Sequence, residues 1–229
     1  MAGSPVAILT TAMKKILTIA ALMLAGAPSL TAQDWSFGAA TGPFVFGDFV
    51  ERSLRVGNGG GSEDAGKLVL SAETSAGVAL DIERRFSDRW AIRLEGTFTR
   101  APLSVEQEDG GGVTIDAGDL DVSTWMLPVV FRINPRGTFR FHLLAGPALA
   151  FYRAEGGGEP VFDETQSEWG AAFGGGVGWW ISDRFAIEGN LTDTITSSPF
   201  SREDFPDVPG IDIPRPHNVH TTVGVRWKF

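Results

Sequence analysis

The stretch Trp90-Ala-Ile-Arg-Leu-Glu-Gly-Thr-Phe98 places its large apolar residues at even-numbered positions and Arg93, Glu95 and Thr97 at odd-numbered ones. A period of two residues is typical of a β-strand whose two faces meet different surroundings. The last segment, 219–229, repeats the pattern. Similar runs occur near residues 35–46, 72–86, 119–133, 138–152, 166–181 and 185–197. The sequence therefore predicts eight strands, and no segment after residue 33 has helical periodicity.

The connections between these segments alternate in length. Residues 87–89 and 182–184 are both Ser-Asp-Arg, and residues 134–137 are Asn-Pro-Arg-Gly, which are typical turn residues. The other four connections are long and rich in glycine, proline and acidic residues, and they cover 47–71, 101–118, 153–165 and 198–216. Outer-membrane barrels combine short periplasmic turns, long extracellular loops and an even number of strands. We therefore predict an all-β fold, an eight-stranded antiparallel up-and-down transmembrane β-barrel.

Aromatic residues mark the short-turn end of this predicted barrel and share the parity of the apolar face. They are Trp35, Phe86, Trp90, Phe131, Phe139, Trp179 and Phe185. Such girdles lie at the interface between membrane and water. A soluble sandwich or a lipocalin-like barrel is the alternative, but neither explains the clustering at one end or the alternating loop lengths. The alternation of the strands also places two charged residues, Arg84 and Asp193, on the lipid-facing side, each near one of the two membrane interfaces.

Composition narrows the class of protein. The chain has 229 residues, 19 basic and 28 acidic side chains, and no cysteine. Cysteine-based catalysis, disulfides and thiolate metal sites are therefore excluded, and the acidic balance argues against nucleic acid as a partner. The content of apolar residues is too high for a disordered chain.

The N-terminus resembles an export signal. Lys14 and Lys15 precede the apolar run 16–27, and small residues end at Ala32. This order of basic, apolar and small residues is typical of a secretory signal peptide. We expect a signal peptide over 1–32, with translation starting at Met13, and a barrel domain over 33–229.

Two motifs carry a resemblance to a known family. The segment Phe86-Ser-Asp-Arg-Trp-Ala-Ile-Arg-Leu-Glu-Gly is echoed by Ile181-Ser-Asp-Arg-Phe-Ala-Ile-Glu-Gly. With the ending Val223-Gly-Val-Arg-Trp-Lys-Phe229, they resemble small outer-membrane β-barrel proteins of the OmpA/OmpX type. The resemblance implies a terminal assembly signal at Val223, Val225, Trp227 and Phe229. It also implies handling by periplasmic chaperones and the barrel-assembly machinery, and residence in a bacterial outer membrane.

The strand positions that alternate with the apolar ones are expected to face the inside of the barrel, and they predict a charged interior. Its members are Asp81, Glu83, Arg85, Arg93, Glu95, Arg132, Arg140, Glu168, Glu188 and Arg226, with His142 and Lys228 beside them. A barrel of eight strands is only wide enough for its own side chains, and unpaired charges there are costly. We expect ion pairs that plug the lumen; a narrow conduit for ions or small solutes is the alternative.

Signals for enzymatic chemistry are weak. His217 and His220 are three residues apart, so a strand places them on opposite faces and they make a poor metal pair. No serine lies close enough to His142 in sequence to suggest a nucleophile. We therefore expect no enzyme, no cofactor and no metal site. The expected function is structural: a monomeric barrel, in contact with outer-membrane lipid and lipopolysaccharide, that stabilises the envelope and displays surface loops. Porin-like transport, or an OmpW-like path for small hydrophobic molecules, is the alternative.

Overall fold

A computed structural model describes residues 35–58, 61–108, 114–155, 165–202 and 210–229 of the chain. The predicted signal peptide and the start at Met13 lie outside these residues. None of the described residues belongs to a helix that is long and apolar enough to cross a membrane. The strands in the described ranges are β1 (Trp35–Phe46), β2 (Val50–Asn58), β3 (Gly61–Ala72), β4 (Ser75–Arg85), β5 (Trp90–Glu108), β6 (Thr114–Met126), β7 (Val129–Arg132), β8 (Phe139–Glu155), β9 (Gln166–Trp180), β10 (Phe185–Thr196), β11 (Ile211–Asp212) and β12 (His217–Lys228).

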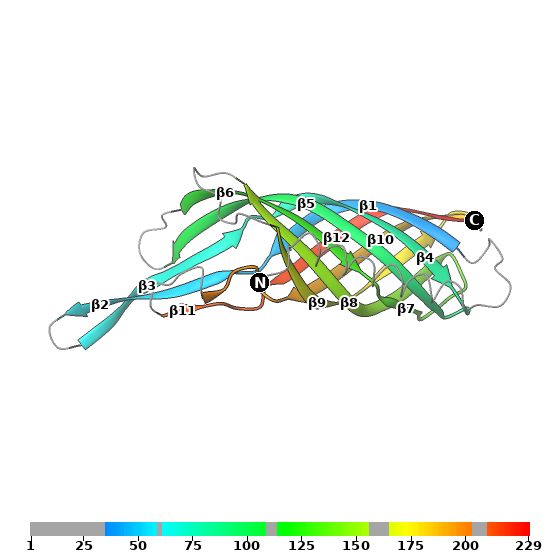
Figure 1. Ribbon diagram of the computed structural model, residues 1–229. Helices are drawn as coiled ribbons and strands as arrows, with labels where there is room; N and C mark the ends of the chain where they lie inside the picture. The colour runs from blue at the N-terminus through cyan, green and yellow to red at the C-terminus, as the bar shows by residue number, and fades with distance from the viewer. Residues whose placement is uncertain (1–34, 59–60, 109–113, 156–164, 203–209) are drawn as a thin grey trace, which may run out of the picture. The chain divides into compact units, whose positions relative to one another are not determined.

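Eight antiparallel strands form the wall of a closed barrel (Figure 1). We call each of these wall strands a stave, and β6 and β7 together count as one. Their order is β1, β4, β5, β6 with β7, β8, β9, β10 and β12, and β12 pairs with β1 to close the ring. β6 and β7 form a single stave that is interrupted at Leu127 and Pro128, because proline has no backbone N–H for the ladder. The Leu127 N–H instead donates to the Pro147 carbonyl over 3.0 Å. The predicted eight-stranded up-and-down barrel is confirmed.

The repeated Ser-Asp-Arg tripeptide forms the same turn twice. The Ser87 Oγ accepts hydrogen bonds from the backbone of Arg89 and Trp90, at 3.3 and 3.0 Å. Ser182 Oγ accepts from the residues at the equivalent positions, Arg184 and Phe185, at 3.3 and 3.1 Å. A serine hydroxyl that binds the backbone two and three residues ahead stabilises a tight turn. Local sequence therefore determines the short-turn end of the barrel.

The opposite end contains more strand than the sequence predicted. The segment 47–71, expected as an irregular connection, contains β2 and β3, which pair as a hairpin. Residues Lys67–Ala72 of β3 pair in antiparallel fashion with Leu103–Glu108 of β5. Figure 1 shows the hairpin extending past the other strands. β5 and β6 also pair within the expected connection 101–118. The prediction was wrong here because these segments lack the contrast between a polar and an apolar face.

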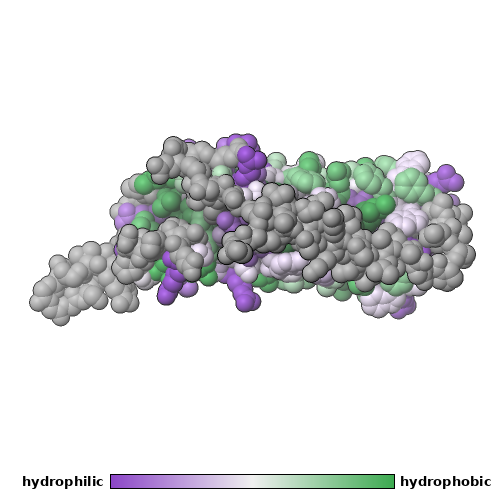
Figure 2. Space-filling model, viewed as in Figure 1, coloured by the Kyte–Doolittle hydropathy of each residue, from purple (hydrophilic) through white to green (hydrophobic). Residues whose placement is uncertain are grey.

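Large apolar side chains are exposed along the outer wall of the barrel, and Figure 2 shows some of them as green patches. All seven predicted girdle residues are at least partly exposed, and three contacts tie rings of neighbouring staves: Trp90 with Phe131, Phe139 with Trp179, and Phe185 with Trp227. The residues of the expected assembly signal, Val223, Val225, Trp227 and Phe229, are all exposed. The Arg84 guanidinium lies 5.6 Å from the centre of the Trp35 ring, and Asp193 Oδ2 lies at hydrogen-bond distance, 2.8 Å, from His217 Nδ1. Both lipid-facing charges therefore have a partner.

Candidate functional site: a plugged lumen

Charged side chains meet inside the short-turn half of the barrel because the strand registers place inward-facing residues of different strands at the same height along the barrel axis. Glu83 lies opposite Arg93 on β4 and β5, and Asp81 lies opposite Glu95 on the same pair. Glu188 of β10, Arg226 of β12 and Arg132 of β7 point into the same space, as their ion pairs show. We call these seven residues, Asp81, Glu83, Arg93, Glu95, Arg132, Glu188 and Arg226, the charged plug.

Arg93 lies at the centre of the charged plug and is only 1% exposed. Its Nε and Nη2 donate to Glu83 Oε2 at 3.1 and 2.9 Å. Nη2 also donates to Glu188 Oε1, on the far side of the barrel, at 3.1 Å. A guanidinium presents its donors in a rigid planar fork, so one arginine can hold carboxylates from two walls at once. Arg93 therefore connects β4, β5 and β10 across the lumen.

Arg226 makes a second cross-link. It binds Glu188 through Nε at 2.6 Å and through Nη2 at 3.0 Å. It binds both oxygens of Asp81, at 2.9 and 3.1 Å, and its Nη1 also donates to Ser36 at 3.2 Å. Two carboxylates thus share each central arginine, and the plug is a network instead of a set of isolated pairs.

Gly38 makes room for this network. In the strand register it lies between Asp81 of β4 and Arg226 of β12. A Cβ at Gly38 would lie 2.0 Å from Asp81 Oδ2, well inside contact distance. The missing side chain therefore lets the Asp81–Arg226 ion pair pass over β1. Sequence parity located both charges, but it did not identify this glycine.

Arg132 lies at the edge of the charged plug, and two histidines lie beside the plug. Arg132 donates to Glu83. His142 Nε2 contacts Asn190 Oδ1 at 3.0 Å and lies 3.9 Å from Glu188, and His220 lies 3.6 Å from Glu95. All three expected histidines are placed as their parity predicts: His142 and His220 are buried, and His217 is exposed.

A cavity of about 20 Å³ lies within the charged plug, between Glu83, Arg93, Arg132, His142 and Glu188. A water molecule needs roughly 10–15 Å³ of such space, so the cavity has room for about one. The described side chains therefore surround a narrow space in the short-turn half of the lumen.

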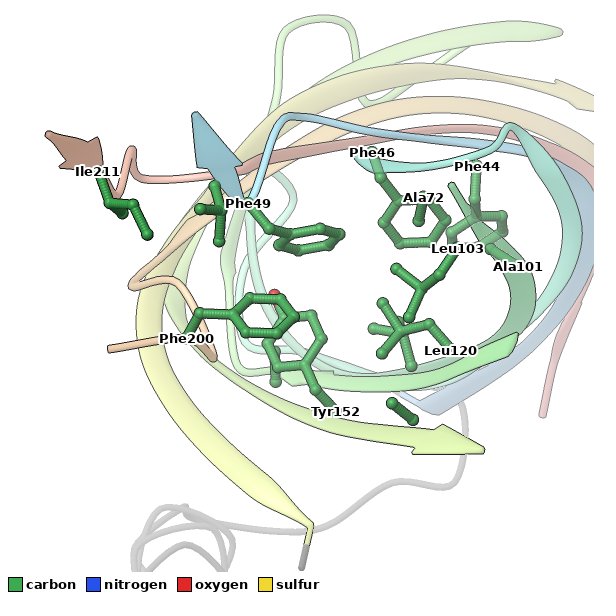
Figure 3. Close-up of a cluster of buried hydrophobic side chains, with 14 residues drawn as sticks. Phe44, Phe46, Phe49, Ala72, Ala101, Leu103, Leu120, Tyr152, Phe200 and Ile211 are labelled. Carbon is green, nitrogen blue, oxygen red and sulfur yellow. The ribbon is translucent and has the colours of Figure 1, made fainter. Parts of the chain in front are cut away.

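A second barrier lies nearer the long-loop end and was not predicted. It is a cluster of buried apolar residues, which we call the apolar cap: Phe44, Phe46, Phe49, Val50, Ala72, Ala101, Leu103, Leu120, Val122, Ala150, Tyr152, Ala154, Phe200 and Ile211 (Figure 3). Phe49 is fully buried, and its ring packs edge-on against Tyr152 at 6.0 Å and against Phe200 at 6.1 Å. Phe49 and Phe200 come from irregular connections, where no periodicity could have shown their direction.

Hydroxyl and amide groups separate the plug from the cap. Tyr152 Oη lies 2.8 Å from Thr196 Oγ1 and accepts a hydrogen bond from Asn218 at 2.9 Å. Thr194 donates to the Met126 sulfur at 3.6 Å. The interior thus changes from charged to polar to apolar towards the long-loop end.

Three of the residues expected in the interior network lie apart from its centre. Arg140 lies over the Trp180 ring at 4.2 Å and donates to the Gly137 carbonyl in a short turn. Arg85 ends β4 opposite Ala91, and Glu168 lies opposite Ala150 towards the other end of β9. Parity predicts which face a residue occupies, but the height along the barrel depends on strand register.

Within the described ranges, no group of three or more histidine or acidic side chains could hold a metal ion. The Asp193–His217 pair lies on the outer wall, where His217 is opposite Ile195 and Asp193 is opposite Val219. Neither cross-strand neighbour has a nucleophilic side chain.

A closed antiparallel barrel with an apolar outer wall and aromatic residues at one rim defines the class of bacterial outer-membrane β-barrel proteins. The chain belongs to the outer membrane protein beta-barrel domain family, whose profile matches residues 17–229. None of the curated protein sequences compared with the chain matches it. The protein is located in the bacterial outer membrane.

Solved structures are similar to the chain at low sequence identity. The outer membrane protein OprG from Pseudomonas aeruginosa is 14% identical, with 86% of this chain and 97% of that chain covered and a TM-score of 0.51. Neisserial surface protein A is 13% identical, with 86% and 97% covered and a TM-score of 0.49. The likeness to OprG shows the fold and no particular activity.

Proposed function

We propose that the protein is a non-enzymatic structural barrel that stabilises the outer membrane and displays its long connections at the cell surface, with a lumen that does not conduct. The observation that carries the proposal is the charged plug. Arg93 and Arg226 bind carboxylates on opposite walls, and the space left between them has room for about one water molecule.

An ion crossing this layer would have to separate ion pairs that are almost completely buried. Arg93 and Glu83 are each 1% exposed, so water does not replace the contacts that an ion would break. Separating a buried pair leaves uncompensated charges, at a cost of about 3–5 kcal/mol. The apolar cap adds a region in which the Tyr152 hydroxyl is the one polar side-chain group among the cap residues, so a hydrated ion would find few hydrogen-bonding partners there. Both barriers favour a closed lumen.

Single-channel recording in planar bilayers tests this proposal. Purified protein, shown to be inserted by its heat-dependent shift on an SDS gel, is expected to give no steady conductance. The Arg136→Gln variant is a matched control, because Arg136 pairs with Asp88 at an exposed turn outside the plug. A reproducible conductance step from the unmodified protein would show that the lumen is a pore.

The partners expected of such a barrel follow from its surfaces. The exposed apolar side chains of the outer wall fit contact with outer-membrane lipid and lipopolysaccharide. Val223, Val225, Trp227 and Phe229 form an exposed terminal stripe, which fits recognition by periplasmic chaperones and the assembly machinery. We propose a monomer, which light scattering of the detergent-solubilised protein checks by its mass.

Passage of small hydrophobic molecules is a second candidate, which the apolar cap favours. Fourteen apolar or aromatic side chains gather at the long-loop end, and two of them, Phe49 and Phe200, lie outside any strand. Uptake of a fluorescent apolar probe by cells with and without the protein separates the candidates. Faster uptake that increases further in the Phe49→Ala variant would favour transport.

A further inference from the structure

The outer wall of the barrel is hollowed by a groove across four neighbouring staves, β4, β5, β6 and β8. The groove has a volume of about 590 Å³, within the usual range for small-molecule sites. Ala76, Val78, Phe98, Ser123 and Phe151 form much of its lining. These positions carry the parity of the lipid-facing side chains, so the groove opens towards the membrane.

The strand register explains why the wall is hollow here. Phe98 of β5 lies opposite Ser123 of β6, and Ser123 in turn lies opposite Phe151 of β8. A small side chain between two large rings leaves a slot between them. Trp125, two residues further along β6, packs against Phe98 with ring centres 5.8 Å apart and bounds the slot on the short-turn side.

Charged residues occupy the next row towards the long-loop end. Arg100 lies opposite Asp121, and Asp121 lies opposite Arg153, so the groove lining holds two guanidinium groups and one carboxylate. Arg100 is ten residues beyond Trp90 in the girdle. At ~2.5 Å of height per tilted residue, it lies ~25 Å above the periplasmic interface. The apolar band of such barrels is ~25 Å tall, so the row lies at the outer interface, where lipid headgroups begin.

We propose that this groove binds one molecule of a phosphorylated, acylated glycolipid of the lipid A type. An acyl chain lies in the slot over Ser123, between Phe98 and Phe151, and a headgroup phosphate binds Arg100 and Arg153. A guanidinium matches the geometry of phosphate oxygens, which it binds through paired hydrogen bonds. Arg100 pairs with Asp119 at 2.9 Å, but both side chains are about half exposed, and exposed pairs contribute little net stability. A phosphate can therefore compete with Asp119. The inference depends on the outer-membrane location and is independent of whether the lumen conducts.

Native mass spectrometry of the folded protein in mild detergent measures binding of added diphosphorylated lipid A. The double variant Arg100→Gln/Arg153→Gln is expected to weaken binding by about tenfold or more, because charge-assisted hydrogen bonds are lost. The Ser123→Phe variant keeps both arginines and fills the slot, and it is expected to weaken binding to a similar extent. The control Arg136→Gln, at the other end of the barrel, is expected to bind like the unmodified protein. A heat-dependent gel shift confirms that each variant is folded.

Three comparison ligands separate the sources of the phosphate: dephosphorylated lipid A, phosphatidylglycerol and inorganic phosphate. We expect each to bind the unmodified protein at least about tenfold more weakly than diphosphorylated lipid A. Equal binding by phosphatidylglycerol or inorganic phosphate would overturn the assignment to a glycolipid. Binding that is unchanged in the double variant, or in Ser123→Phe, would overturn the site itself.

Discussion

Replacement of Arg93 by methionine removes the central cation of the charged plug and keeps a side chain of similar length. Arg93 holds Glu83 at 2.9 Å and Glu188 at 3.1 Å, and the side chain is 2% exposed. Removing one partner of a buried ion pair costs about 3–5 kcal/mol, because a buried charge is left uncompensated. Screening by water does not reduce this figure, since the site is almost dry. We therefore expect a loss of about 3–5 kcal/mol in the free energy of unfolding.

Urea-induced unfolding in lipid vesicles, followed by tryptophan fluorescence, measures this loss. The matched control is Arg136→Gln, in which an exposed ion pair is broken at an expected cost of about 0–1 kcal/mol. The double variant Arg93→Met/Glu83→Gln is expected to lose less than the sum of the two single variants, by about 0.5–3 kcal/mol, since the residues contact each other. If Arg93→Met loses no more stability than Arg136→Gln, the plug does not stabilise the barrel.

Three further substitutions test other parts of the structure. Gly38→Ala puts a Cβ 2.0 Å from Asp81 Oδ2 and is expected to lose about 1–3 kcal/mol in the same urea assay, whereas Gly189→Ala, whose nearest neighbour is 3.9 Å away, serves as the control. Phe49→Ala empties the centre of the apolar cap; we expect a loss of about 3–5 kcal/mol, and an unchanged urea midpoint would contradict the packing. Phe229→Ser alters the exposed terminal stripe and is expected to reduce the heat-shifting form in outer-membrane fractions, while the same protein refolded in detergent still shifts; equal amounts in the membrane would remove the assembly role.

The short-turn half of the barrel could be predicted from the sequence because its two faces differ in chemistry. On β5, Ile92 and Leu94 face lipid while Arg93 and Glu95 face the plug, so the alternation is visible in the residue types themselves. The turns were equally clear, because serine hydroxyls bind the adjacent backbone and no distant contact is needed. The number of strands in the barrel wall, the direction in which their side chains face and the barrel class all followed from these local features.

The long-loop half could not be predicted in the same way, because apolar residues also fill the lumen there. Leu103 and Leu120 point inward, so their strands lose the contrast between faces on which the alternation depends. The position of each inward residue along the barrel axis was the second feature that the sequence could not predict. Arg140 and Glu168 have inward parity, yet they lie towards opposite ends of the barrel, because register between tilted strands decides which inward residues become level. The groove on the outer wall depends on register for the same reason, since Phe98, Ser123 and Phe151 come from three separate strands.

The two faces of β5 support separate roles. Arg93 and Arg100 are seven residues apart, and an odd separation on a strand places side chains on opposite faces. Arg93 is buried among carboxylates of the same chain, so its charge is satisfied within the protein. Arg100 is half exposed on the outer wall beside an apolar slot, so it can contact molecules of the membrane. If the lumen is closed as proposed, recognition falls to the outer wall and the long connections, which are the surfaces where the proposed functions of this barrel lie.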